Sequence, residues 1–139
     1  MAQPTTKSPV EILKATHAAF DDGDIEAVLG FFDEDIEWTT FMGTAHGRTA
    51  VQEEVFPSFA ALLEEHNVSY QQEVDTYLSE GDDVVAFGRS ILSKEGETIE
   101  LPFAQHCRVV DGKLTYGHGY HDTAKFFGFL DVDDPRPSE

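Results

Sequence analysis

A set of polar side chains occupies two predicted strands near the C-terminal end of the chain, where the neighbouring residues are mostly apolar. Alternation predicts strands over 97–110 and 113–121, and the Asp111-Gly112 pair between them is a strong hairpin signal. Buried polar groups need a hydrogen-bond partner or a ligand. We therefore expect this hairpin to form one wall of a small-molecule pocket. The polar residues concerned are Gln105, Cys107, His118, Tyr120, His121 and Asp122.

Arg89 and Asp122 are the residues we expect to carry acid/base chemistry. Arg89 shares a predicted strand face with apolar residues, and a buried guanidinium is costly unless a carboxylate neutralises it. Asp122, at the end of the last strand, is the candidate partner. A nearby cation would lower its pKa and a dry cavity would raise it, so their balance decides between an ion pair and a general acid or base. Asp122 is equally well placed to cap a helix that begins at Thr123.

The two faces of the last strand give different pocket residues. If the face with Gly117 and Gly119 points inward, His121 lines the pocket and Tyr120 points outward; the opposite orientation exchanges the two. Phe103 marks the inward face of the neighbouring strand and favours the first orientation.

Gln105 shares the inward face with Phe103 and Cys107. Its amide could orient a ligand carbonyl, or it could be a satisfied core amide. Cys107 is interpreted as an inert thiol, because no cationic group is predicted beside it.

Further lining candidates come from the first half of the chain. His17 falls on the apolar stripe of the first predicted helix, where a packed histidine is the alternative interpretation. Trp38 and Phe59 are aromatic wall candidates, and simple core packing is the alternative for each. The chain has 6 histidines, but they show no tight ligand motif, so neither a metal nor a cofactor is expected.

The elements that position these residues follow in a simple order. Capping boxes at Ser8 and Thr49 predict helix starts. Between them, Asp24 is predicted to cap a helix over 25–32, and Pro57 predicts a kink in the helix after Thr49. A short strand is predicted over 36–40, and Met42 to Gly47 are predicted to form a loop. Strands are then predicted over 68–78, 84–93, 97–110 and 113–121, before a helix over 123–129. The expected class is α+β: a cone-shaped, curved antiparallel sheet wrapped around three N-terminal helices.

Composition limits the partners. The formal net charge is −18, against a magnitude of about 2 to 8 for an ordinary small domain. Such a surface repels nucleic acids and anionic membranes, so neither is an expected partner. An acidic coat suits the salt-rich cytoplasm of a halophilic host, and an acidic mesophilic protein is the alternative.

One domain over 9–130 is expected, with a flexible N-terminus at 1–8 and a flexible acidic tail at 131–139. No apolar run approaches the roughly 18 residues of a membrane span, and no signal sequence is recognised, so the expected location is the cytoplasm.

Three stretches carry motifs in a characteristic order: Phe20-Asp21-Asp22-Gly23-Asp24 with 31–32 and 36–38, then 43–48, then Asp111-Gly112-Lys113 leading to 120–124. Over 9–130 they resemble the SnoaL-like, ketosteroid-isomerase-related branch of the nuclear-transport-factor-2-like superfamily. The resemblance implies a cystatin-like cone with a deep cavity, and a homodimer formed through the outer face of the sheet.

Departures from characterised members narrow the chemistry that the resemblance implies. At the catalytic positions of ketosteroid isomerase this chain has Trp38, Thr16 and Gln105, so that mechanism is not expected. Limonene epoxide hydrolase would place its arginine at Arg89 and one carboxylate at Asp122, but its second carboxylate falls at Ile91. The single aspartate of the SnoaL-type cyclases matches Asp122.

The leading expectation is therefore a protein that binds a small apolar organic molecule and performs an acid/base step: isomerisation, cyclisation or hydration. Asp122 would transfer the proton, and Arg89 and Gln105 would place the substrate. The alternative is a non-catalytic ligand-binding or dimerisation module of the same fold, in which Asp122 only caps a helix. A protein-docking adaptor finds no support, because no exposed apolar motif stands out.

Overall fold

The computed structural model describes residues 7–131. The helical elements are α1 (Pro9–Asp21), α2 (Ile25–Gly30), α3 (Arg48–Ala50), the π-helical turn η1 (Val51–Val55), α4 (Phe56–Glu65) and α5 (Thr123–Leu130). The strands are β1 (Phe32–Thr40), β2 (Gly43–His46), β3 (Ser69–Glu80), β4 (Asp83–Lys94), β5 (Glu97–Val110) and β6 (Lys113–His121). The predictions of flexible ends fall almost entirely outside the described residues.

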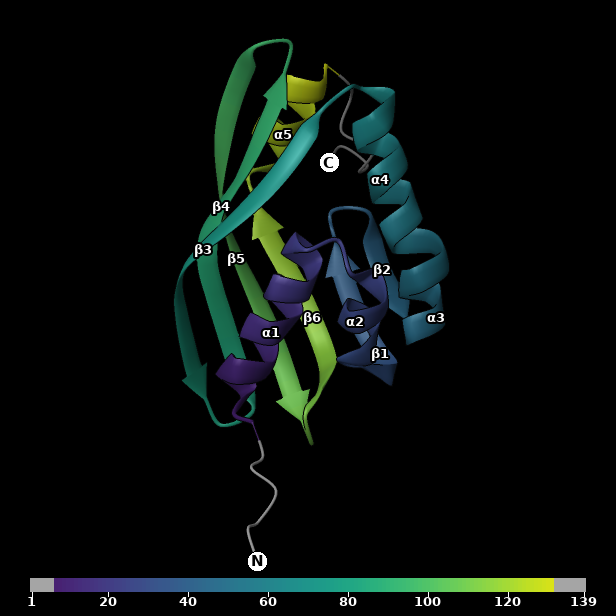
Figure 1. Cartoon of the computed structure of the whole chain (residues 1–139), viewed down its shortest axis with the longest axis vertical. Coiled ribbons are helices and arrows are strands. Elements are labelled where there is room, and N and C mark those ends of the chain that lie inside the picture. The colour runs from purple at the N-terminus through teal and green to yellow at the C-terminus, as the bar shows by residue number, and fades with distance from the viewer. Residues whose placement is uncertain (1–6, 132–139) are drawn as a thin grey trace, which may run out of the picture.

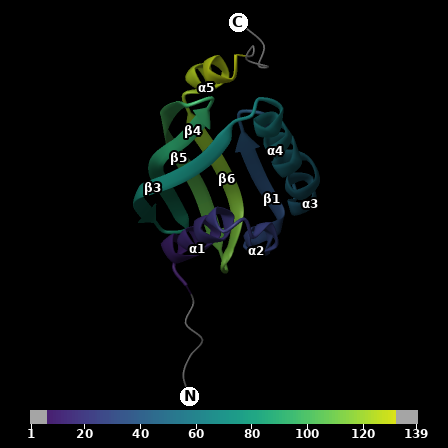
Figure 2. The same cartoon turned by 45° about the horizontal axis from the view of Figure 1, so that its top comes forward.

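The strands form one six-stranded sheet in the order β2-β1-β6-β5-β4-β3. Neighbouring strands are antiparallel except for β1 and β6, which pair in parallel although they come from opposite ends of the domain. The sheet curves around α1, and α4 stands beside β1 on the same side (Figures 1 and 2). The predicted α+β class and the curved sheet wrapped around N-terminal helices are confirmed.

The first two helices begin as their caps predict. Ser8 Oγ accepts a hydrogen bond from the backbone N–H of Glu11, and the Glu11 carboxylate accepts one from the N–H of Ser8, which completes the capping box. Asp24 caps α2 by accepting from the N–H of Ala27. These caps satisfy donors that the helix itself cannot, so the start of each helix is encoded locally.

The third helix departs from its prediction. It begins after Gly47, at a φ of 96°, and the predicted cap at Thr49 does not form. The helix widens into η1 before Pro57, which lies in the first turn of α4. Because proline lacks an N–H and disfavours a continuous α-helix, the interruption falls where Pro57 predicts it.

The four long strands begin and end within two residues of their predicted bounds. At two hairpins the turn pairs Glu95-Gly96 and Asp111-Gly112 all have positive φ, the geometry of a type I′ turn. The predicted loop between Met42 and Gly47 instead contains β2, which pairs with β1.

The apolar side chains form two clusters inside the cone. The larger joins α1, α2 and the start of β1 to the closed ends of β4, β5 and β6, around Leu13, Phe32, Ile36 and Leu114. The smaller joins α5 to β4 and β5, around Leu92, Leu101 and Phe127. The space between the two clusters is where a cavity can form.

A close backbone approach at Gly88 shapes the sheet. Gly88 pairs with Val74, where β3 has a bulge between Val74 and Thr76. A Cβ at position 88 would lie 2.8 Å from the Cα of Val74 and even closer to the carbonyl oxygen of Glu73. Bulges bend and twist a strand, so the missing side chain allows β3 to fold toward the helices.

We predict that Gly88→Ala lowers the free energy of unfolding by at least about 2 kcal/mol, because the backbone of β3 would have to move. Gly128→Ala is the control, since a Cβ there meets nothing within 4 Å and a glycine-to-alanine change inside a helix is neutral or stabilising. Urea unfolding of both variants measures the difference. Equal stability of the two variants would contradict the tight approach.

Candidate functional site

A cavity of about 140 Å³ lies between the concave face of the sheet and the helices. A space of about 10–15 Å³ is enough for one enclosed water, so this cavity is large enough for a small ligand. The prediction of a hollow cone is therefore supported. The main apolar lining residues are Leu13, Phe20, Phe32, Trp38, Phe41 and Phe59, and the main polar ones are His17, Tyr70, Gln72, Ser90, Gln105 and His121.

The lining carries no formal charge: among the described residues that line the cavity, none is Asp, Glu, Lys or Arg. The chain has 27 acidic and 9 basic residues, so this is a separation of charge from the interior. An isolated ion in an apolar cavity is strongly disfavoured. The site is therefore built for an uncharged ligand.

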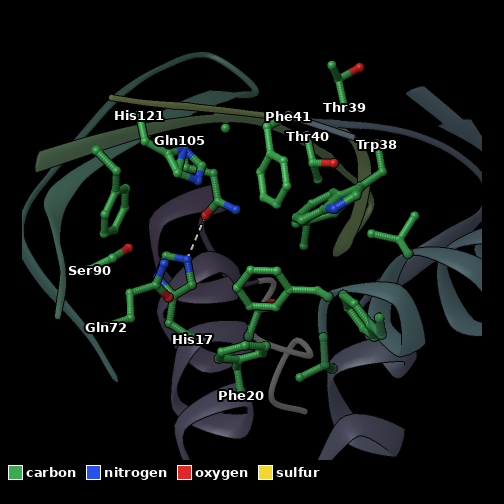
Figure 3. A pocket seen from close by; sticks show the side chains of 18 of the residues that line it. His17, Phe20, Trp38, Thr39, Thr40, Phe41, Gln72, Ser90, Gln105 and His121 are labelled. Carbon is green, nitrogen blue, oxygen red and sulfur yellow. Dashed lines mark hydrogen bonds between the residues drawn. The ribbon is translucent and has the colours of Figure 1, made fainter. Parts of the chain in front are cut away.

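His17 on α1 joins two strands by hydrogen bonds. Its Nε2 lies 2.7 Å from Gln105 Oε1 on β5, and its Nδ1 lies 2.8 Å from the hydroxyl of Tyr77 on β3. Figure 3 shows the bond to Gln105 and the amide nitrogen of Gln105 turned away from His17, toward the space beside Phe41. Burial lowers the pKa of His17, against the opposing effect of the bond to Gln105, so the imidazole is neutral near pH 7.

His121 lines the cavity from the end of β6. Its Nδ1 is buried, and no hydrogen-bond partner for that atom is found in the described part of the chain. Its ring meets Phe41 edge-on at 6.1 Å and lies beside Gly119, where a Cβ would be in ordinary van der Waals contact with it. Burial lowers the pKa of His121. A neutral imidazole nitrogen without a partner is a natural contact for a ligand.

Three further polar residues of the lining, Tyr70, Gln72 and Ser90, form hydrogen bonds with one another. The Tyr70 hydroxyl lies 3.1 Å from Ser90 Oγ, and Gln72 donates to the same hydroxyl over 3.4 Å. Burial raises the pKa of Tyr70, which keeps the phenol protonated. These bonded side chains add polarity to this wall.

Trp38 covers the opposite wall and depends on Gly117. The rings of Trp38 and Phe32 lie 4.9 Å apart. A Cβ at position 117 would come within 3.0 Å of the indole ring, so the glycine makes room for it. Gly117 thus accommodates an aromatic ring on the inner face of β6.

Six of the residues predicted from sequence meet at the cavity: His17, Trp38, Phe59, Phe103, Gln105 and His121. The inward orientation of this face of β6 is also confirmed, because Gly119 and His121 line the cavity and Gly117 faces the ring of Trp38. Tyr120 is not in the lining; it is 51% exposed on the outer face of the sheet, stacked on His118 at 4.2 Å. Placing Tyr120 in the pocket was wrong, because adjacent residues of a strand point to opposite faces.

Arg89 lies on the convex face of β4, outside the cavity, with its side chain 38% exposed. It forms ion pairs with Glu73, with Asp75 at 3.2 Å and with Glu100 at 3.0 Å, the last at Nε without hydrogen-bond geometry. Asp75 and then Glu73 raise the pKa of Arg89. The inference that this guanidinium meets a carboxylate was right, but the inference that it does so inside the cone was wrong.

The error on Arg89 has a physical reason. Both faces of β4 carry apolar residues. Val84, Ala86 and Leu92 are buried on the inner face, whereas Val85 and Phe87 share the outer face with Arg89. Alternation shows which residues share a face but cannot tell the inner face from the outer one when both carry apolar residues.

Asp122 is exposed and caps α5. Its Oδ1 accepts a hydrogen bond of 3.0 Å from the N–H of Lys125. It is absent from the cavity lining, and its partner is the helix rather than Arg89. The capping interpretation describes this contact, and the prediction of a cavity-facing carboxylate was wrong because the chain leaves the sheet at His121.

Cys107 is buried in the larger apolar cluster. Burial raises the pKa of its thiol to about 12. A thiol that stays protonated at neutral pH is a poor nucleophile, in agreement with the interpretation from sequence.

Sequence reasoning missed Tyr77, Tyr70, Gln72 and Ser90. Ser90 follows from alternation on β4 once the inner face is known. Tyr77 does not: Tyr70 and Gln72 occupy even positions, and only the bulge between Val74 and Thr76 turns the odd-numbered Tyr77 to the same side. A bulge of this kind leaves no clear mark in the sequence.

Within residues 7–131, no group of three or more His, Cys, Asp or Glu side chains is arranged to hold a metal ion. The helices in the same part of the chain fall short of the length and apolarity needed to cross a membrane.

Comparisons with known proteins identify the family. The model of the SnoaL-like domain matches residues 13–117. The chain belongs to the SnoaL-like family. Its fold is that of the nuclear-transport-factor-2-like superfamily, as the motifs indicated. A search of curated proteins finds no match to this SnoaL-like protein.

Solved structures agree with this placement. TerC, co-crystallized with polyporic acid, is 26% identical, with a TM-score of 0.78 over 89% of this chain and 98% of that chain. An NTF2-like protein of unknown function from Burkholderia pseudomallei is 20% identical, with a TM-score of 0.76 over 91% of this chain and 99% of that chain. An NTF2-like protein from Burkholderia thailandensis is 26% identical, with a TM-score of 0.72 over 85% of this chain and 93% of that chain.

The lowered pKa values of His17 and His121 predict a loss of stability on mild acidification. The ordinary histidine pKa is 6.5, so the unfolded chain takes up protons before the folded protein does. The stabilising contribution is fully present above about pH 6.5 and is lost as the pH falls through the folded-state pKa values. We expect the free energy of unfolding to fall between about pH 7 and pH 5, and to fall less in His121→Asn.

Urea unfolding at several pH values measures this difference. The comparison between wild type and variant cancels the contribution of the carboxylates, which both proteins share. Identical pH dependence of the two would contradict a neutral, buried His121.

Proposed function

We propose that this SnoaL-like protein binds a small, uncharged, largely apolar organic molecule in the cavity and exchanges a proton with it at His121. The observation that carries the proposal is the charge-free lining of a cavity in a protein whose surface is strongly acidic. Anionic ligands would meet neither a cation inside nor a favourable field outside. The co-crystallization of TerC with polyporic acid supports an organic ligand for a protein of this fold.

Acid/base chemistry would depend on His121 instead of Asp122. A carbonyl compound that places an acidic C–H bond at Nδ1 would lose that proton to the imidazole lone pair, while the carbonyl oxygen takes up negative charge. Return of the proton to another atom completes an isomerisation. Gln105 pairs with Gly119 across the strands, so His121 is its diagonal neighbour on the same face, within reach of one small ligand.

A non-catalytic ligand-binding role is the second candidate. The observation that favours it is the lack of a carboxylate in the described lining, so that no acid and base of different type converge on the ligand. Both candidates share the binding step and differ only in whether His121 moves a proton.

A homodimer through the outer face of the sheet stays a prediction. It is supported by large apolar side chains on that face: Leu78 is 58% exposed, Phe87 42% and Tyr120 51%. Phe87, Ala104 and Tyr120 lie in one cross-strand row, which makes a continuous strip. The cytoplasmic location and the halophilic host also stay predictions.

We predict that acetophenone binds at least tenfold more tightly than benzoate, because only the neutral compound avoids burying an unpaired charge. The chain has one tryptophan, so the indole N–H signal of Trp38 reports binding in an NMR titration. Arg89→Gln is the control and should leave both affinities unchanged, since Arg89 lies outside. Equal binding of benzoate, or a loss of binding in Arg89→Gln, would contradict the proposal.

The two candidate roles are separated by hydrogen exchange on 2-tetralone, a neutral ketone with acidic C–H bonds. If His121 transfers protons, the protein accelerates the exchange of these hydrogens with D₂O, and His121→Asn abolishes most of the acceleration while 2-tetralone still binds. Proton NMR follows the exchange. If the wild-type protein does not accelerate the exchange, the catalytic role is refuted and the non-catalytic role is the one that stands.

A further inference from the structure

Three side chains form a hydrogen-bonded chain that ends at the cavity. Tyr77 on β3 contacts Nδ1 of His17 on α1, at 2.8 Å. Nε2 of the same ring contacts Oε1 of Gln105 on β5, at 2.7 Å. Because a neutral imidazole carries only one N–H, its two nitrogens cannot both donate.

The arrangement has one consistent direction. Gln105 Oε1 is an acceptor, so His17 Nε2 carries the proton and donates it. Nδ1 is then an acceptor, and the hydroxyl of Tyr77 donates to it. Burial and then Asp21 raise the pKa of Tyr77, so the phenol keeps its proton and is available as the donor.

This direction determines what Gln105 presents to the cavity. With Oε1 held by His17, the amide N–H groups are the free end of the side chain, on the side away from His17 (Figure 3). The position across from Gln105 on β6 is Gly119, which has no side chain to cover the amide. The free donors therefore remain available to a ligand.

Several other polar groups in the wall are already paired, whereas Nδ1 of His121 has no partner among the described residues. The Thr16 hydroxyl donates to the carbonyl of Ile12 at 2.8 Å, and Tyr70 and Ser90 are bonded to one another. Gln105 is thus a fixed donor in a lining whose hydroxyls are largely occupied.

We infer that the cavity selects molecules that present a hydrogen-bond acceptor, a carbonyl oxygen, to the amide of Gln105, and that Tyr77 and His17 are positioning residues that set this preference. The inference rests on the proposed function, in that the cavity must bind a small uncharged molecule. It adds the functional group that the ligand carries and the residues that specify it.

The test compares acetophenone with α-methylstyrene, which has the same shape but a CH₂ group in place of the carbonyl oxygen. We expect wild type to bind acetophenone about tenfold more tightly, the preference that one hydrogen bond to an otherwise unpaired buried donor gives. Gln105→Met should bring the two affinities within about twofold. Tyr77→Phe should reduce the preference, and Tyr120→Phe, on the outer face, should retain it.

Equal affinities in wild type would overturn the inference while leaving the proposed function intact, because both probes would still bind. Retention of the full preference in Tyr77→Phe would remove Tyr77 and His17 as its source.

A measurement on the wild-type protein does not depend on how the variants fold. Long-range ¹H–¹⁵N NMR distinguishes the two neutral tautomers of His17, and we expect the proton on Nε2. A proton on Nδ1 would overturn the inference whatever the probes do. Failure of every probe to bind would refute the proposed function, and the tautomer would still decide the direction of the chain.

Discussion

The bend of the sheet around α1 is the constraint on which the rest of this protein depends. A curved sheet cannot fill its concave side with its own side chains, so helices and a cavity share that space. Gly88 and the bulge opposite it allow β3 to turn inward, and Gly117 makes room for Trp38. Polar groups that face this space lose contact with bulk water and must find partners. The pairing of Tyr77, His17 and Gln105, and the lack of charge in the lining, follow from that requirement.

The described residues that line the cavity carry no formal charge. The chain has a formal net charge of −18, and acidic residues at the surface find partners such as Arg89 for Glu73 and Asp75, and Arg108 and His106 for Asp83. Such exposed pairs contribute little individually. Their placement matters more than their strength, because it leaves His17 and His121 as the described lining residues that can change charge on mild acidification. The chemistry open to this cavity is therefore that of imidazole, amide and hydroxyl groups.

His17 and His121 differ in what surrounds them. His17 is held at both nitrogens, which suits a residue that orients its neighbour, whereas the buried Nδ1 of His121 has no partner among the described residues. A histidine that is bonded on both sides resists a change of tautomer, and one that is free on one side can meet a ligand. The same residue type thus serves positioning at one wall and contact at the other.

The sequence by itself determined the class of the fold, the bounds of the long strands, the helix caps at Ser8 and Asp24 and six residues of the cavity lining, because these depend on local hydrogen bonds and on alternation along one strand. Only the tertiary structure decided that Arg89 lies outside, that Asp122 serves α5, and that Tyr77 reaches His17. Each of these depends on a relation between distant segments: which of two apolar faces of β4 meets the helices, where the chain leaves β6, and where a bulge reverses the alternation of β3. Alternation along a strand shows which side chains share a face, but only the packing of the sheet against the helices decides which face is the inner one.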